Sequence, residues 1–195
     1  MIIGITGGTG CGKTTALRTI ENLGGVIIDC DQVYHDLLRT DVAMLSAIEN
    51  RFPGTVKEGI LDRKALAAIV FSDDNALKDL NAITHDAVKN KVHEILATQP
   101  GLVAIDAIAL FESGLHKLCD VTVAVTAPED VRIGRLVQRD HITEQQARMR
   151  IDAQKNQDYF IEICDYVLEN AGTQADFQEK CLAFFQKLLT IKETT

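Results

Sequence analysis

The chain lacks tryptophan, has only three prolines among its 195 residues, and contains no long apolar run. Its longest apolar stretch, residues 102–111, is interrupted by Asp106 and is shorter than the roughly 20 residues that a membrane-spanning helix needs. Cysteines are few, and none are spaced as C-x-x-C: Cys11, Cys30, Cys119, Cys164 and Cys181. These absences argue against a membrane span, a disulfide framework and a zinc site, and they predict a cytoplasmic protein.

Positive charge is also in short supply. Lys and Arg number 20 against 28 Asp and Glu, so the formal net charge is -8, and no basic run is longer than a pair. Nucleic-acid binding needs a basic face that releases counterions from phosphates. We therefore expect no nucleic-acid partner. An anionic metabolite is not excluded, because a local group of backbone N–H groups binds anions whatever the net charge.

The composition that is present, 46% hydrophobic and 25% charged, suits one α/β domain. Short apolar runs alternate with helical periodicity, and they predict strands over residues 2–6, 26–28, 102–105, 121–125 and 166–168. Apolar strands separated by helices predict a five-stranded parallel sheet covered by helices on both faces. Between these elements we expect a loop over residues 53–59 and a helix that begins at Pro128.

Residues 7–14 carry the strongest motif, GGTGCGKT, which fits G-x-x-x-x-G-K-[ST] between a predicted strand and a predicted helix. Glycines let backbone N–H groups point inward around phosphates, and the helix N-terminus adds a favourable field. In such a loop Lys13 reaches the β- and γ-phosphates and the Thr14 hydroxyl binds Mg²⁺. The strand before and the helix after disfavour an accidental glycine turn, so the motif predicts a loop that binds the phosphates of a nucleotide.

Three carboxylates follow predicted strands. Asp29 and Asp31 come after residues 26–28, and ligands of open α/β sheets bind beyond the carboxyl ends of the strands. A carboxylate there can accept a proton from an acceptor hydroxyl or hold metal-bound water. The alternative is that Asp31 caps a helix beginning at Gln32, and the neighbouring phosphate loop favours the first role. Asp106 is either a Mg²⁺ ligand through water or an ordinary strand-terminal aspartate.

Arginines cluster in the last third of the chain. Arg132, Arg135 and Arg139 lie at i, i+3 and i+7 and so share one helical face, and Arg148 and Arg150 follow shortly. Arginine forks suit the oxygens of a transferring phosphoryl group. Nearby carboxylates allow ordinary surface pairing instead: Glu129, Asp130, Asp140 and Glu144. We expect at least one of the arginines to be functional.

Taken in order, these motifs resemble those of the dephospho-CoA kinase family, which phosphorylates the ribose 3′-hydroxyl of dephospho-CoA in the last step of coenzyme A synthesis. The matching segments are the phosphate loop at 4–15, D-x-D at 29–31, G-x-L-D-R at 59–63, L-N…H at 80–85, L-F-E at 110–112, R-D at 139–140, R-I-x-A-Q at 150–154 and N-x-G at 170–172. Asp86 and Ile108 stand where the family usually has proline, and Arg132 where glutamine is frequent.

The resemblance implies a nucleoside-monophosphate-kinase-like P-loop fold. Its parts would be a nucleotide-binding core (about 1–31, 100–134 and 159–195), a helical substrate lobe (about 32–99) and a lid (about 135–158). The two helical insertions also follow from the periodicity, which places more helix there than strand crossovers need.

The resemblance also implies the site. The implied catalytic residues are Lys13, Arg139 and Asp31, the last as the base. The implied nucleotide-binding residues are Gly8, Thr9, Gly10, Cys11, Gly12, Lys13, Thr14, Thr15 and Asn170. The implied substrate-binding residues are Asp31, Arg63, His85, Leu110 and Glu112, and the implied Mg²⁺ ligands are Thr14 and Asp106. ATP and dephospho-CoA are the implied substrates.

Other classes of P-loop protein compete with this interpretation. A kinase of the uridine-kinase type carries a similar loop, although the D-x-D, G-x-L-D-R and L-N…H segments speak against it. A GTPase would need an N-K-x-D segment, which the sequence lacks. A regulatory ATPase would turn over ATP with no acceptor. The sequence leaves the oligomeric state open.

Overall fold

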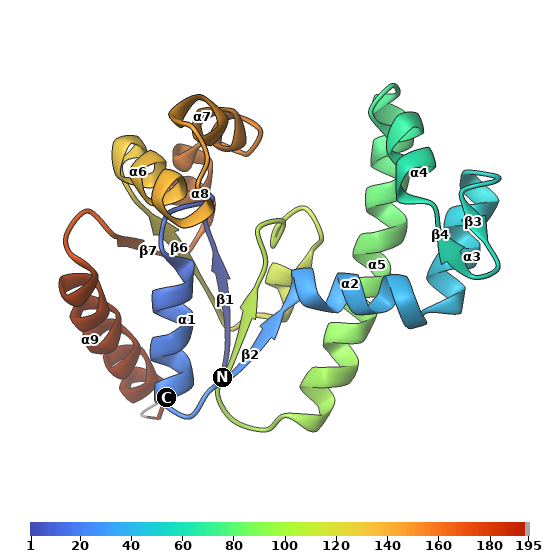
Figure 1. Ribbon diagram of the computed structural model, residues 1–195. Helices are drawn as coiled ribbons and strands as arrows, with labels where there is room; N and C mark the ends of the chain where they lie inside the picture. The colour runs from blue at the N-terminus through green and yellow to red at the C-terminus, as the bar shows by residue number, and fades with distance from the viewer. Residues whose placement is uncertain (194–195) are drawn as a thin grey trace. The chain divides into compact units, whose positions relative to one another are not determined.

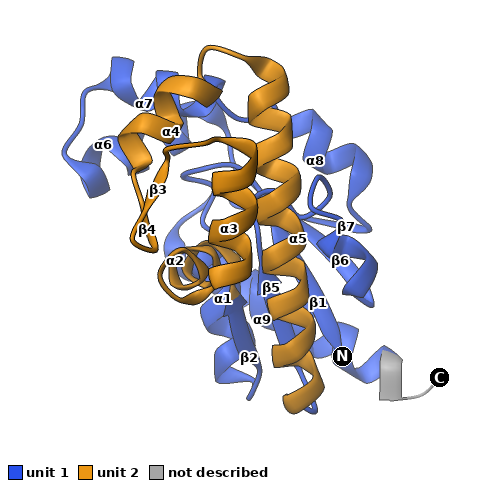
Figure 2. Ribbon diagram, turned by 90° about the vertical axis from the view of Figure 1, so that its right-hand side faces the viewer, with its two compact units in different colours: residues 1–28, 99–195 blue, residues 29–98 orange. Residues whose placement is uncertain are grey.

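The computed structural model describes residues 1–193 (Figure 1). The chain forms two compact units (Figure 2). Unit 1 consists of residues 1–28 and 99–195, and unit 2 of residues 29–98. In the described part of the chain, no helix combines the length and the apolar character that crossing a membrane requires.

Unit 1 is built on a sheet with the strand order β2-β5-β1-β6-β7. The strands are β1 (Ile2–Thr6), β2 (Val26–Asp29), β5 (Val103–Asp106), β6 (Val121–Thr126) and β7 (Tyr166–Glu169). Strand β1 pairs in parallel with β5 on one side and β6 on the other, and β6 pairs in parallel with β7. The predicted five-stranded parallel sheet is confirmed, with β1 at its centre.

The helices of unit 1 are α1 (Lys13–Asn22), α6 (Glu129–Asp140), α7 (Glu144–Asp152), α8 (Gln157–Ile163) and α9 (Gln174–Glu193), with a 3₁₀ turn η1 (Leu115–Leu118). Helices α1 and α9 lie side by side (Figure 1). Pro128 precedes α6 as its N-cap rather than starting it, because its ψ of 146° is not helical. Helix α7 begins with a capping box between Thr143 and Gln146.

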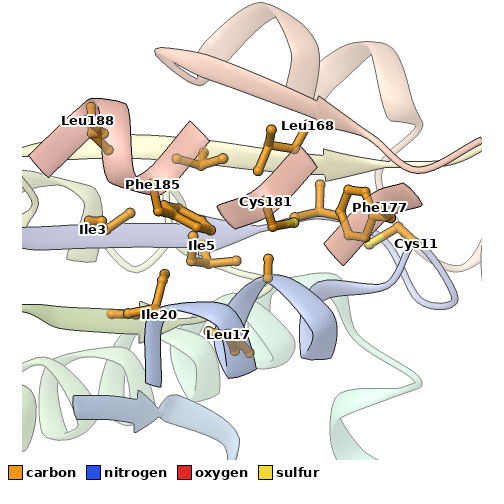
Figure 3. Close-up of a cluster of buried hydrophobic side chains, with 14 of the residues drawn as sticks. Ile3, Ile5, Cys11, Leu17, Ile20, Leu168, Phe177, Cys181, Phe185 and Leu188 are labelled. Atoms are coloured by element: carbon orange, nitrogen blue, oxygen red, sulfur yellow. The ribbon is translucent and has the colours of Figure 1, made fainter. Parts of the chain in front are cut away.

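Buried apolar side chains from β1, α1, β7 and α9 form the main core of unit 1 (Figure 3). Ile5 of β1, Ile20 of α1 and Phe185 of α9 are completely buried. Each such side chain stabilises the fold by about 1.5–3 kcal/mol relative to exposure. This core fixes β1 and α1, the two elements that flank residues 7–12.

Unit 2 contains α2 (Cys30–Thr40), α3 (Val42–Arg51), β3 (Val56–Lys57), β4 (Ile60–Leu61), α4 (Arg63–Val70) and α5 (Asp74–Thr98). Helix α5 contacts each of the other three helices. The antiparallel pair β3–β4 corrects the predicted loop over residues 53–59. Its turn residues, Glu58 and Gly59, both have positive φ (53° and 78°), as a type I′ hairpin turn requires.

The start of α2 corrects a second expectation. The helix begins at Cys30, and the Asp29 carboxylate accepts a hydrogen bond from the Gln32 backbone N–H at 3.0 Å. Asp29 is therefore the N-cap, and the alternative that Asp31 caps the helix is wrong. Asp31 lies exposed in the first turn, where its negative charge is favourable near the helix N-terminus.

The division into core, lobe and lid stays a prediction. Its lid would begin at Arg135, which lies in the middle of α6 rather than at a helix end. Helices α6 and α7 share a small apolar cluster of their own: Ile133, Leu136, Ala147 and Ile151.

Candidate active site

A pocket of about 530 Å³ lies at the carboxyl end of β1, and every residue that lines it belongs to unit 1. The lining comes from residues 8–15 of the phosphate loop and α1, from α6 and from Asn170. The pocket therefore brings together all the predicted nucleotide-binding residues, the predicted metal ligands Thr14 and Asp106, and two of the predicted catalytic residues, Lys13 and Arg139.

The loop has the backbone that its glycines allow. Gly12 has a φ of 100°, and a Cβ there would lie 2.2 Å from Asn170 Nδ2, so a side chain is excluded on both grounds. The Lys13 Nζ donates to the Gly7 carbonyl oxygen at 2.9 Å. The ammonium group is therefore folded back along the loop.

Asn170 and Arg135 hold the carbonyl groups of the loop from outside. Asn170 is only 4% exposed; its Nδ2 donates to the Cys11 oxygen at 2.9 Å and its Oδ1 accepts from Arg135 Nη2 at 2.9 Å. Arg135 Nη1 donates to the oxygens of Gly10 and Cys11, both at 3.3 Å. These bonds fix the direction in which the peptide groups of the loop face.

Two further side chains hold Thr9, and sequence reasoning missed both contacts. Arg132 Nε donates to the Thr9 oxygen at 2.9 Å, and Gln154 Oε1 accepts from the Thr9 N–H at 2.8 Å. Arg132 is 5% exposed, so it is not one of the surface arginines that its position in the sequence suggests. Gln154 lies in the R-I-x-A-Q segment, and this segment was the sequence signal that could have identified it as a site residue, although the resemblance implied no role for it.

The remaining arginines pair with carboxylates. Arg139 lines the pocket, yet its Nε and Nη2 donate to Asp140 at 2.7 and 3.0 Å. These hydrogen bonds lower the pKa of Asp140, and Arg150 adds to the effect. Arg148 binds Glu129 at 2.9 Å between two well-exposed side chains. The expected pairing with carboxylates is thus observed for Arg139, Arg148 and Arg150, and Arg139 also lines the pocket.

Oxygen donors are the groups that the pocket offers to a metal. Asp106 ends β5, and Thr14 lies in the first turn of α1. No cluster of three or more His, Cys, Asp and Glu side chains suitable for a metal occurs within residues 1–193. Mg²⁺ commonly binds one or two carboxylates together with waters and substrate phosphates, so Thr14 and Asp106 are residues that could hold it.

The predicted substrate-binding residues are divided between the units. In unit 1, Leu110 is completely buried, and its role in substrate binding stays a prediction. Exposed Glu112 accepts a hydrogen bond from the Tyr159 hydroxyl at 3.1 Å. In unit 2, Arg63 is the exposed first residue of α4, and half-buried His85 lies on α5. The third catalytic candidate, Asp31, also belongs to unit 2.

Comparison with known proteins identifies the family. A family model described as dephospho-CoA kinase matches residues 1–176. The dephospho-CoA kinase of Lactobacillus acidophilus is 35% identical, with 98% of each chain covered. The chain belongs to the dephospho-CoA kinase family.

Solved structures agree with this membership of the dephospho-CoA kinase family. A Thermus thermophilus protein is 32% identical with a TM-score of 0.79, covering 96% of this chain and 97% of its own. The dephospho-CoA kinase of Campylobacter jejuni is 26% identical with a TM-score of 0.69, covering 96% of both. The predicted family, the P-loop kinase fold and the assignment as an ATP-using phosphotransferase are confirmed.

Proposed function

We propose that the chain transfers the γ-phosphoryl group of ATP to the ribose 3′-hydroxyl of dephospho-CoA, giving CoA and ADP. The observation that carries this proposal is that the phosphate loop of a dephospho-CoA kinase family member lines a pocket of about 530 Å³. Nothing observed favours a uridine-kinase-like enzyme or a regulatory ATPase.

Residues of the loop bind the triphosphate in this proposal. The N–H groups of residues 8–15 and the N-terminus of α1 together attract anions. Lys13 leaves the Gly7 oxygen and places its charge on the β- and γ-phosphates. Because Asn170 and Arg135 already hold the loop carbonyls, little ordering of the loop is needed when ATP binds.

Thr14 and Asp106 would hold Mg²⁺, Thr14 through its hydroxyl and Asp106 through a water bound to its carboxylate. Both are oxygen donors and both line the pocket, so they fit the ion. When bound, Mg²⁺ neutralises charge that develops on the phosphates. No other residue is proposed as a ligand.

The acceptor side of the reaction depends on Asp31, Arg63 and His85. We assign to Asp31 the removal of the proton from the acceptor hydroxyl, and to the other two the binding of dephospho-CoA. Arg139 would exchange Asp140 for the transferring phosphoryl group. Residues 135–158 would act as the lid that keeps water from the γ-phosphate. The substrates are small molecules, and the net charge of -8 supports the absence of a nucleic-acid partner.

A coupled ADP-release assay tests the proposal. Dephospho-CoA, adenosine, uridine and AMP are offered separately with ATP and Mg²⁺, and the product is identified by mass spectrometry. ADP release should require dephospho-CoA and Mg²⁺ and should yield CoA. A larger response to another acceptor would contradict the proposed substrate, and equal ADP release without any acceptor would indicate an ATPase.

A further inference from the structure

Side chains from two distant segments hold both backbone polar groups of Thr9. Arg132 of α6 donates to the Thr9 oxygen at 2.9 Å, and Gln154, which follows α7, accepts from the Thr9 N–H at 2.8 Å. Thr9 lies in the first half of the phosphate loop and lines its pocket. The contacts of Asn170 and Arg135 hold the second half of the loop, so the first half depends on a separate pair of residues.

Arg132 is an unusual residue to bury. It is 5% exposed, and its Nη2 has no hydrogen-bond partner among the described residues. Burying a charged group costs free energy unless that group is paired and hydrogen-bonded. Within the described part of the chain, this arginine donates a hydrogen bond from Nε to the Thr9 oxygen, and this bond links the buried guanidinium to the loop.

Gly8 makes room for the guanidinium. A Cβ at Gly8 would lie 2.5 Å from Arg132 Nη2 and 3.0 Å from Cζ, whereas Gln154 Oε1 would be 3.4 Å away. Gly8 is not among the glycines with positive φ, so its backbone conformation accepts alanine. Glycine is thus needed at position 8 because a side chain there would clash with the Arg132 guanidinium, and not because of the backbone conformation.

We infer that Arg132 and Gln154 are positioning residues that fix the phosphate loop at Thr9 and so raise its affinity for ATP. The inference rests on the proposed function only in that the loop binds ATP. Anchoring the loop before ATP arrives reduces the conformational entropy that binding must remove. A hydrogen bond with a charged donor can account for an effect of about 10- to 100-fold in affinity.

A matched pair of variants isolates the hydrogen bond. In Arg132→Gln the amide nitrogen can occupy the place of Nε, while Cζ and both terminal nitrogens are removed. Arg132→Met has the same chain length and no donor. Calorimetric titration with ATP and Mg²⁺ should show affinity near that of the wild type for Gln and a loss of about 10-fold or more for Met. In turnover, the Met variant should raise KM for ATP more than it lowers kcat.

Arg148→Met is the control, because the guanidinium of Arg148 binds Glu129 at an exposed site; it should leave ATP affinity unchanged.

Gln154 has its own matched pair. Gln154→Glu keeps an acceptor for the Thr9 N–H and Gln154→Met does not, so the Met variant should bind ATP more weakly than the Glu variant.

Gly8→Ala provides a second, independent measurement, which also decides the matter if Arg132→Met fails to fold. Alone it should weaken ATP binding, because its Cβ displaces the guanidinium. Combined with Arg132→Gln it meets neither Nη2 nor Cζ, so the double variant should bind ATP more tightly than Gly8→Ala alone.

Equal ATP affinity of Arg132→Gln and Arg132→Met, or a double variant no better than Gly8→Ala, would overturn the inference. These outcomes are distinct from a failure of the proposed function. If the proposed function failed, wild-type protein would still bind ATP in the calorimetric titration but would not phosphorylate dephospho-CoA.

Discussion

Replacing Asp31 with asparagine separates catalysis from helix capping. Asp31→Asn removes the negative charge and keeps the size of the side chain. The substituted residue is exposed in the first turn of α2 and does not cap the helix, so unit 2 should lose only the small favourable interaction of this charge with the helix N-terminus, less than the loss of a cap. If Asp31 is the base, the rate should fall by about 10²–10⁴-fold.

Asp29 provides the matched control two residues away. Its carboxylate accepts from the Gln32 N–H at 3.0 Å, and Asp29→Ala removes this cap. Loss of an N-cap costs about 1 kcal/mol. For a protein of this size we expect Tm to fall by about 2–4 °C for each kcal/mol. Asp29→Asn retains an acceptor for the same N–H and should restore most of the stability.

The assay combines thermal unfolding with steady-state kinetics at saturating ATP and dephospho-CoA. Stability should follow the capping ability of residue 29, and kcat should follow the charge of residue 31. Wild-type turnover by Asp31→Asn would refute its role as the base. A drop in Tm for Asp31→Asn as large as that for Asp29→Ala would refute the assignment of the cap.

Other perturbations test the phosphate pocket. Lys13→Met should lower kcat by about 10²-fold or more and raise KM for ATP, and wild-type kinetics would exclude a phosphate contact. Asn170→Ala removes the bonds to Cys11 and Arg135 and should weaken ATP binding by about 10- to 100-fold in calorimetry, whereas unchanged affinity would exclude a role for those bonds. Arg139→Ala should lower kcat by up to about 10³-fold with little change in KM for dephospho-CoA, and Arg139→Lys should restore only part of the lost kcat. Arg148→Ala is the surface control; an unchanged kcat in Arg139→Ala would mean that Arg139 only pairs with Asp140. Burial raises the pKa of the Cys11 thiol, that of Cys119 to about 12, and those of Cys164 and Cys181 to about 11. Because the thiolate is the reactive form, a thiol reagent at pH 8 should modify these four cysteines slowly until the protein is denatured.

Local patterns predicted the parts of the fold that depend on neighbouring residues. The predicted strand over residues 2–6 matches β1, and α1 starts at Lys13, because an apolar run, a glycine turn and helical periodicity are all local signals. The hairpin β3–β4 was missed because two-residue strands are too short to show alternation. The predicted start of α2 was late by two residues, and this shift alone moved the expected cap from Asp29 to Asp31.

The site was predictable only where one segment carries it. Residues 8–15 follow from the loop motif, whereas the contacts of Arg132 and Gln154 with Thr9 join positions 123 and 145 residues apart. Helical spacing placed Arg132 on a face with Arg135 and Arg139, and it gave no sign that this face meets the loop. Although Arg132 shares a helical face with Arg139, it is buried, so it could not serve as a surface control for Arg139.

The central place of β1 in the sheet has a consequence for folding during synthesis. Strand β1 is synthesised before its partners β5 and β6, which begin about half the chain later, at Val103 and Val121. Unit 2 is made of consecutive residues, 29–98, and its helices are complete before either partner of β1 exists. Such non-local pairing slows folding, because long loops must close first. We therefore expect a nascent chain to acquire protease resistance within residues 29–98 before the phosphate loop is anchored at both ends.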